Sequence, residues 1–123
     1  MILKTSLLVA AALLAVGAHD PLKDLNIGDA LPAADIAMKD VMGGDKSLSA
    51  LKGESGLLVI FSCNTCPFVI GSEGSTGWEN RYPELGNFCR TNKIGFALVN
   101  SNSTKREAGD GFADMQAHYK EKN

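Results

Sequence analysis

The chain has 123 residues, the length of one ordinary domain. Hydrophobic residues make up 45% and charged residues 21%, a globular balance that excludes a disordered or collagen-like chain. The 12 basic and 14 acidic side chains give a formal net charge of −2, and no basic run is present, so nucleic acid is not an expected partner.

The N-terminal residues have the pattern of a cleavable secretory signal peptide. Lys4 is followed by a nearly unbroken apolar run over residues 6–16, and small residues occupy the −3 and −1 positions of the expected cleavage site. The run is shorter than the roughly 20 apolar residues of a membrane-spanning helix, and no cysteine follows it for a lipid anchor. We therefore expect a signal peptide at 1–18 and a domain at 19–123 that is periplasmic or secreted, with membrane contact only through the uncleaved signal peptide.

Hydrophobic patterning predicts a βαβ core preceded by an N-terminal β-hairpin. Two short apolar runs are typical of strands buried on both faces of a parallel sheet. A glycine-rich stretch at 71–77 is expected to interrupt the helix that follows the first of them. In chain order, the expected elements are hairpin strands within 35–41 and 46–48, a helical turn at 49–53, a strand at 57–61, a helix from Pro67, a helix at 78–92, a strand at 94–99, and a final helix with Phe112, Met115 and Tyr119 on its apolar side.

Cys63 and Cys66 form a C-x-x-C pair where the first apolar strand leads into a helix. Pro67 suits the first turn of that helix, where a missing N–H costs little. The N-terminal end of the helix is expected to stabilise a thiolate on Cys63, and the two-residue spacing allows Cys66 to close a small disulfide ring. The pair predicts thiol–disulfide exchange without a bound cofactor, with protein or small-molecule thiols and disulfides as partners.

Other uses of a C-x-x-C pair are weaker interpretations. A zinc site needs two more ligands, and Cys89, His19 and His118 lie far apart in the sequence with no second C-x-x-C. Inert thiols are disfavoured in an oxidising compartment, and a permanent disulfide across so short a loop stabilises little. Binding of a soft ion such as Cu(I) by both thiolates stays open as the alternative, as does a redox-inactive binding module. Cys89 itself is expected to be a buried apolar thiol.

The remaining candidate residues have ordinary structural interpretations. Trp78 and Tyr82 are expected to pack in the core rather than line a substrate surface. His118 is expected to be solvated or to cap the final helix. Asp110 and Asp114 are expected to be ordinary acidic residues at the start of that helix.

Residues 56–69 resemble the active-site region of the thioredoxin-like redoxins, within the alkyl hydroperoxide reductase/thiol-specific antioxidant superfamily. The peroxiredoxin-like and TlpA-like branch with a C-N-x-C-P motif is the most similar. Its opening segment, first turn and second central strand resemble residues 27–32, 47–53 and 97–102. The resemblance implies a thioredoxin-like α/β fold and thiol–disulfide oxidoreductase activity, with Cys63 as the nucleophile and Cys66 as the resolving thiol.

The sequence also departs from that family. A complete thioredoxin-like domain continues into a strand preceded by a cis-proline, whereas the prolines here lie at 21, 32, 67 and 83 and the sequence ends at Asn123. We therefore expect the C-terminal half of the fold to be missing and the domain to be incomplete. The peroxiredoxin motif P-x-x-x-T-x-x-C fits neither cysteine, since Gly56 and Ile60 occupy its positions before Cys63. A peroxiredoxin-like antioxidant activity is thus an alternative that ranks below disulfide exchange.

Overall fold

The computed structural model describes residues 24–122, so the signal peptide expected at 1–18 lies outside the described residues. The chain forms two units, one ending at Ala30 and one beginning at Leu31. In the described part of the first unit, the Asn26 N–H donates to Asp29 Oδ2 at 2.9 Å and the Asp29 N–H donates back to the Asn26 carbonyl at 3.1 Å, which closes a turn. Across residues 24–122, no helix has the length and apolar character needed to cross a membrane.

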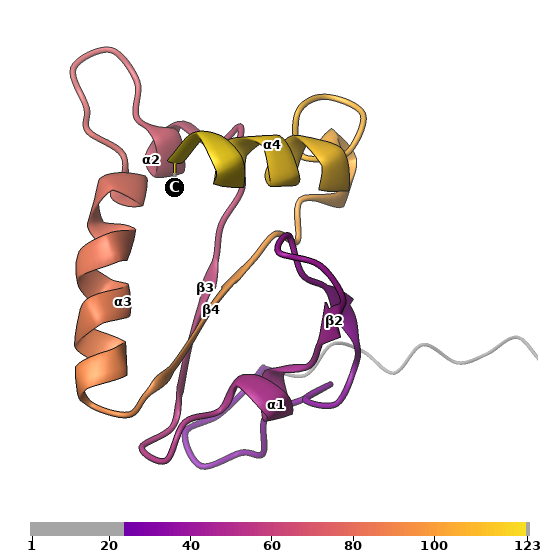
Figure 1. The fold of residues 1–123 in the computed structure, drawn as a ribbon, viewed down its shortest axis with the longest axis vertical. Helices are drawn as coiled ribbons and strands as arrows, with labels where there is room; N and C mark the ends of the chain where they lie inside the picture. The colour runs from indigo at the N-terminus through magenta and orange to yellow at the C-terminus, as the bar shows by residue number, and fades with distance from the viewer. Residues whose placement is uncertain (1–23, 123) are drawn as a thin grey trace, which may run out of the picture. The chain divides into compact units, whose positions relative to one another are not determined.

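The second unit is mixed α/β and contains two small sheets of two strands each (Figure 1). The β3 strand (Leu57–Phe61) pairs in parallel with β4 (Gly95–Val99), which confirms the parallel arrangement predicted from the two apolar runs. Phe61 lies opposite Val99, so both strands end at the same edge of the sheet. The loop that carries the cysteine pair leaves from this edge.

The hairpin is also present, but its strands are shorter than expected. β1 (Met38–Lys39) pairs antiparallel with β2 (Asp45–Lys46). The turn begins early because the Asp40 carboxylate accepts the Met42 N–H at 2.9 Å and pairs with the Lys46 ammonium at 2.9 Å. The hydrogen bond and the ion pair of Asp40 therefore end β1 at Lys39, whereas the alternating pattern predicts strand structure within residues 35–41.

The helices that the sequence predicts lie at or near their expected positions, and a 3₁₀ turn at Ser103–Lys105 is present in addition. α2 begins at Pro67 and is followed by Gly71, so the glycine-rich stretch ends it as predicted. The helix expected at 78–92 starts as a 3₁₀ turn before it becomes α-helical. The helical elements are α1 (Leu48–Leu51), α2 (Pro67–Ile70), η1 (Trp78–Arg81), α3 (Tyr82–Thr91), η2 (Ser103–Lys105) and α4 (Phe112–Lys122).

The apolar core of the described chain is small. Its buried apolar side chains are Val69, Cys89 and Ala97. The expectation that both central strands are buried on both faces is wrong, since Phe61 at the end of β3 is 71% exposed and Leu98 in β4 is also exposed. The physical reason is that a sheet of two strands has too few neighbouring elements to cover both of its faces. A cavity of about 730 Å³ between the hairpin, β4 and α4 is lined mainly by apolar side chains, among them Met38, Leu48, Phe96, Phe112 and Met115.

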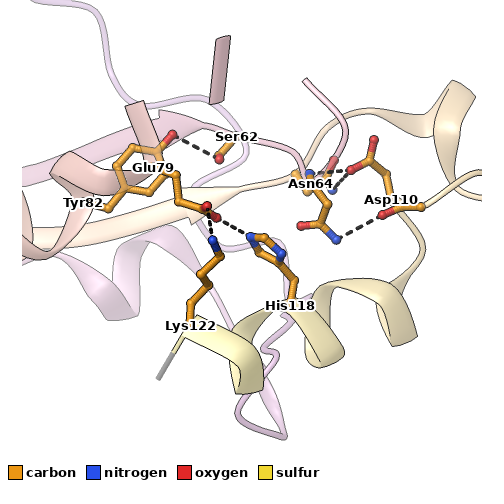
Figure 2. Close-up of polar contacts among 9 residues, drawn as sticks. Ser62, Asn64, Glu79, Tyr82, Asp110, His118 and Lys122 are labelled. Carbon is orange, nitrogen blue, oxygen red and sulfur yellow. Dashed lines mark hydrogen bonds and ion pairs between the residues drawn. The ribbon is translucent and has the colours of Figure 1, made fainter. Parts of the chain in front are cut away.

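Glu79 connects the C-terminal helix to η1 (Figure 2). Its carboxylate contacts His118 Nε2 and lies 3.0 Å from Lys122 Nζ, and both partners belong to α4. The expectation that His118 is solvated or caps the helix is wrong, because its ring is part-buried against Glu79. Gln116 Nε2 donates to the Val41 carbonyl at 3.3 Å and ties the same helix to the hairpin turn.

Replacing Glu79 tests how much this contact stabilises the fold. Burial alone raises the pKa of Glu79, but hydrogen bonds from His118 and Lys122 outweigh it and lower the pKa below its usual value. A carboxyl group with a lowered pKa stabilises the fold above its unfolded pKa of about 4.3, and this stability is lost as the pH falls through the folded pKa. We expect Glu79→Gln to lower the free energy of unfolding at pH 7 by about 1 kcal/mol.

Urea denaturation at several pH values measures this effect. As the pH falls through the lowered folded pKa, the wild type and Glu79→Gln are expected to converge, because below that pKa the wild-type carboxyl group is protonated in both states. Glu54→Gln is the matched control, since Glu54 forms an exposed pair with Lys93 at 2.7 Å and exposed pairs contribute little. A loss in Glu79→Gln that stays the same at acid pH would contradict the assignment.

Candidate functional site

Cys63 and Cys66 lie in the loop between β3 and α2, at the edge where β3 and β4 end. The Ser62 N–H donates to the Val99 carbonyl at 2.9 Å, so the pairing of the sheet continues to the residue before Cys63. The Cys66 carbonyl accepts the N–H groups of Val69 at 2.9 Å and of Ile70 at 3.0 Å, and the bond from Ile70 belongs to the single turn of α2. Both cysteines are half-buried free thiols.

The acidity of Cys63 differs from the sequence-based expectation. The pKa of its thiol is raised above the usual value, with burial as the largest cause. The Cys66 N–H donates to the Cys63 sulfur and acts in the opposite direction, while the negative charges of Cys66 and Asp110 raise the pKa further. The N-terminal end of α2 does little to stabilise a thiolate on Cys63, because α2 has only four residues and Cys63 precedes it. The prediction of a thiolate stabilised by the helix is therefore wrong.

Asp110 is the residue of this site that the sequence interpretation missed. Its side chain is 3% exposed and its carboxylate accepts four hydrogen bonds. Two come from the residues between the cysteines: the Asn64 N–H donates to Oδ1 at 2.6 Å and the Thr65 hydroxyl donates to Oδ2 at 2.7 Å. The other two come from beyond β4, where the side-chain amides of Asn100 and Asn102 donate at 3.2 and 2.7 Å. Figure 2 shows Asp110 facing Asn64.

The four donors match the capacity of an ionised carboxylate. Burial alone raises the pKa of Asp110, but the four hydrogen bonds outweigh it and lower the pKa below its usual value. Asp110 therefore carries a buried negative charge, and its interpretation as an ordinary acid at the helix start is wrong. Asp114 does fit that interpretation, since its Oδ2 accepts the Gly111 N–H at 3.0 Å beside the start of α4.

Gly109 completes the contact between the segment before α4 and the cysteine loop. Its carbonyl accepts a hydrogen bond from Asn64 Nδ2 at 3.1 Å. Its φ of +103° lies in the region that favours glycine, and an added Cβ would lie 2.9 Å from Thr65 Cγ2. Both the backbone angle and the close approach favour glycine here, and they allow the neighbouring Asp110 to reach the loop.

A second cavity, of about 390 Å³, opens beside Cys66. Phe68 is 82% exposed and Trp78 60% exposed at its border, so the expectation that Trp78 packs in the core is wrong. Tyr82 also lines the cavity, and its hydroxyl lies 3.2 Å from Ser62 Oγ (Figure 2). The cavity is lined by Cys66 together with Ile60, Phe61, Phe68, Val69, Trp78, Tyr82 and Leu85. One cysteine of the pair therefore faces an apolar, largely aromatic surface.

The third cysteine takes no part in this site. Cys89 lies in α3 and is 1% exposed, which confirms its prediction as a buried apolar thiol. Among residues 24–122, no three His, Cys, Asp or Glu side chains are grouped so that they would hold a metal ion. His19, named above as a conceivable ligand, lies outside the described residues.

The proposed function has to be argued from the residues of the site, because comparison with known proteins gives no match. No family model matches the chain, and neither the curated proteins nor the solved structures contain a significant match.

Proposed function

We propose that the protein is a thiol–disulfide oxidoreductase with a thioredoxin-like fold that acts outside the cytoplasm. The observation that supports this most is the position of the C-x-x-C pair. It follows the parallel-paired strand β3 and precedes a helix that begins at Pro67. The Cys66 N–H that donates to the Cys63 sulfur supports Cys63 as the nucleophile, since this donor also stabilises the thiolate formed there.

The reaction is a two-step exchange of sulfur partners. The Cys63 thiolate attacks one sulfur of a substrate disulfide, the substrate S–S bond breaks, and the second substrate sulfur leaves as a thiolate that takes up a proton. Cys66 then gives up its proton and attacks the Cys63 sulfur, which forms the protein disulfide and releases the first substrate sulfur as a thiolate. Two electrons pass to the substrate, and an external dithiol returns the protein to its reduced form by the same chemistry.

The aromatic cavity beside Cys66 supports a substrate with apolar surface next to its disulfide. Phe68 and Trp78 present exposed rings at its border. Aromatic rings bury a large apolar area on contact. The proposed substrates are therefore disulfides of proteins or small molecules whose sulfur is flanked by apolar groups.

Equilibration of the full chain with mixtures of reduced and oxidised dithiothreitol tests this function. We expect Cys63 and Cys66 to lose their thiols together, in one reversible step, while Cys89 stays reduced because it is buried. Loss of the Cys63 and Cys66 thiols in two separate steps, at different ratios of reduced to oxidised dithiothreitol, would contradict the proposal. So would tight binding of one Cu(I) by both thiols against a competing chelator without any disulfide formation.

A further inference from the structure

The Asp110 carboxylate joins the distant cysteine loop to two segments that lie near each other in the sequence. Its oxygens bind the loop between the cysteines and the segment after β4, and Asp110 itself precedes α4. The hydrogen bonds to Asn64 and Thr65 span 46 and 45 positions of sequence. A residue placed in this way fixes the loop relative to the rest of the unit.

Two groups of the cysteine loop donate to Asp110. The Asn64 N–H donates to Asp110 Oδ1 at 2.6 Å. The Thr65 hydroxyl adds a second bond to Asp110 at 2.7 Å, so both residues between the cysteines are held by one side chain. Asp110 thus fixes the conformation of the two residues between the cysteines.

The same carboxylate places a negative charge next to the pair. Burial is the largest cause of the raised pKa of Cys63, and the charges of Cys66 and Asp110, the titratable groups that act on it, raise that pKa further. The four donors around Asp110 are neutral, and among residues 24–122 no salt bridge reaches this carboxylate. Its charge is therefore not cancelled by a neighbouring cation.

We propose that Asp110 is a positioning residue of the cysteine pair, and that its buried charge, held against the two residues between the cysteines, adds to the burial of Cys63 in disfavouring the thiolate and makes the pair an electron donor. This inference rests on the proposed exchange function. A C-x-x-C pair oxidises its partners strongly when its reduced form is stabilised by an ionised thiolate. Since the charge of Asp110 disfavours that thiolate, the reduced form lacks this stabilisation and the protein disulfide is favoured. The dithiol then transfers two electrons to a substrate disulfide and becomes oxidised itself.

The rate at which iodoacetamide alkylates Cys63, read from its peptide by mass spectrometry across a pH series, measures this effect. Thiolates react and thiols do not, so the midpoint of the profile reports the ionisation of Cys63. Asp110→Asn is expected to lower the midpoint by about one pH unit, which is tenfold in proton affinity, because a neighbouring negative charge is removed. Asp114→Asn removes the same charge at an exposed position near the start of α4 and is expected to leave the midpoint unchanged.

A midpoint in Asp110→Asn that stays the same or rises would overturn the inference, and so would an equal shift in Asp114→Asn. If circular dichroism shows that Asp110→Asn does not fold, Asn102→Lys carries the test. It keeps the carboxylate and places a cation where an amide now lies 2.7 Å from Oδ2. Its midpoint is expected to fall by about half a pH unit, which is about threefold in proton affinity. An unchanged midpoint would overturn the inference.

A separate experiment tests whether the cysteine pair is an electron donor. In a glutathione buffer that keeps a strongly oxidising C-x-x-C protein reduced, the wild-type chain is expected to become the disulfide while glutathione disulfide is reduced to two thiols. A chain that stays reduced there, yet forms the disulfide with stronger oxidants, would overturn the donor assignment and leave the exchange function standing. A chain that forms no Cys63–Cys66 disulfide under any condition would overturn the exchange function. The alkylation profile does not depend on exchange, so the two failures are distinguishable.

Discussion

Cys63→Ser is expected to abolish disulfide exchange, whereas Cys66→Ser is expected to leave the first attack intact and trap the partner on Cys63. The first substitution removes the attacking sulfur. The second removes the sulfur that resolves the mixed disulfide, so the intermediate accumulates. The two variants therefore differ in kind, although each removes one of two half-buried thiols in the same loop.

Incubation with oxidised glutathione followed by peptide mass spectrometry measures both results. Cys66→Ser is expected to carry one glutathione on Cys63, and Cys63→Ser is expected to carry none. Cys89→Ser is the matched control: it is expected to exchange like the wild type and to lose about 1 kcal/mol of stability, since Cys89 is buried in α3 away from the pair. Glutathione trapped on Cys66 instead of Cys63 would reverse the proposed roles.

Gly95→Ala is expected to lower the free energy of unfolding by about 3 kcal/mol, because a new methyl group meets backbone that cannot move away. Gly95 is the first residue of β4, and an added Cβ would collide with the carbonyl oxygen of Leu51 at the end of α1. It would also lie 2.9 Å from Cδ1 of Leu57, the residue paired with Gly95 across the sheet. The close packing of α1 on β4 therefore depends on this glycine.

Gly86→Ala is the matched substitution with the opposite expected sign. Gly86 lies inside α3, and its added Cβ would be 3.7 Å from the Phe96 ring, which is an ordinary contact. Alanine is favoured over glycine in a helix by about 1 kcal/mol, so Gly86→Ala is expected to stabilise the protein by up to that amount. Urea denaturation of both variants compares them directly. A Gly95→Ala variant as stable as the wild type would show that α1 does not pack on β4 in this way.

Much of the fold could be predicted from local sequence patterns. The apolar run at 57–61 predicts a strand without reference to the rest of the chain, and Pro67 with the glycines after it predicts a short helix. Burial of the strands could not be predicted in the same way, because it depends on how many elements cover the sheet. Phe61 is apolar and lies in a strand, yet it is 71% exposed.

The two cysteines of the candidate site could be predicted from the sequence, but Asp110, which holds the loop between them, could not. Cys63 and Cys66 are recognised by a spacing of three positions, whereas Asp110 binds residues 46 and 45 positions earlier in the chain. No periodic pattern connects such distant residues. The one available signal was the pair of asparagines, Asn100 and Asn102, directly after an apolar strand, since both of their side-chain amides bind Asp110.

The reversible joining of Cys63 to Cys66 is the central claim, and disulfide mapping tests it most directly. The full chain is equilibrated over a series of dithiothreitol ratios, free thiols are blocked, and the disulfide-linked peptides are identified by mass spectrometry. The proposed function predicts one disulfide, Cys63–Cys66, that forms with the loss of two hydrogens and disappears again on reduction, with Cys89 blocked as a free thiol throughout. A chain that keeps all three thiols at every ratio, or whose disulfide contains Cys89, would contradict it.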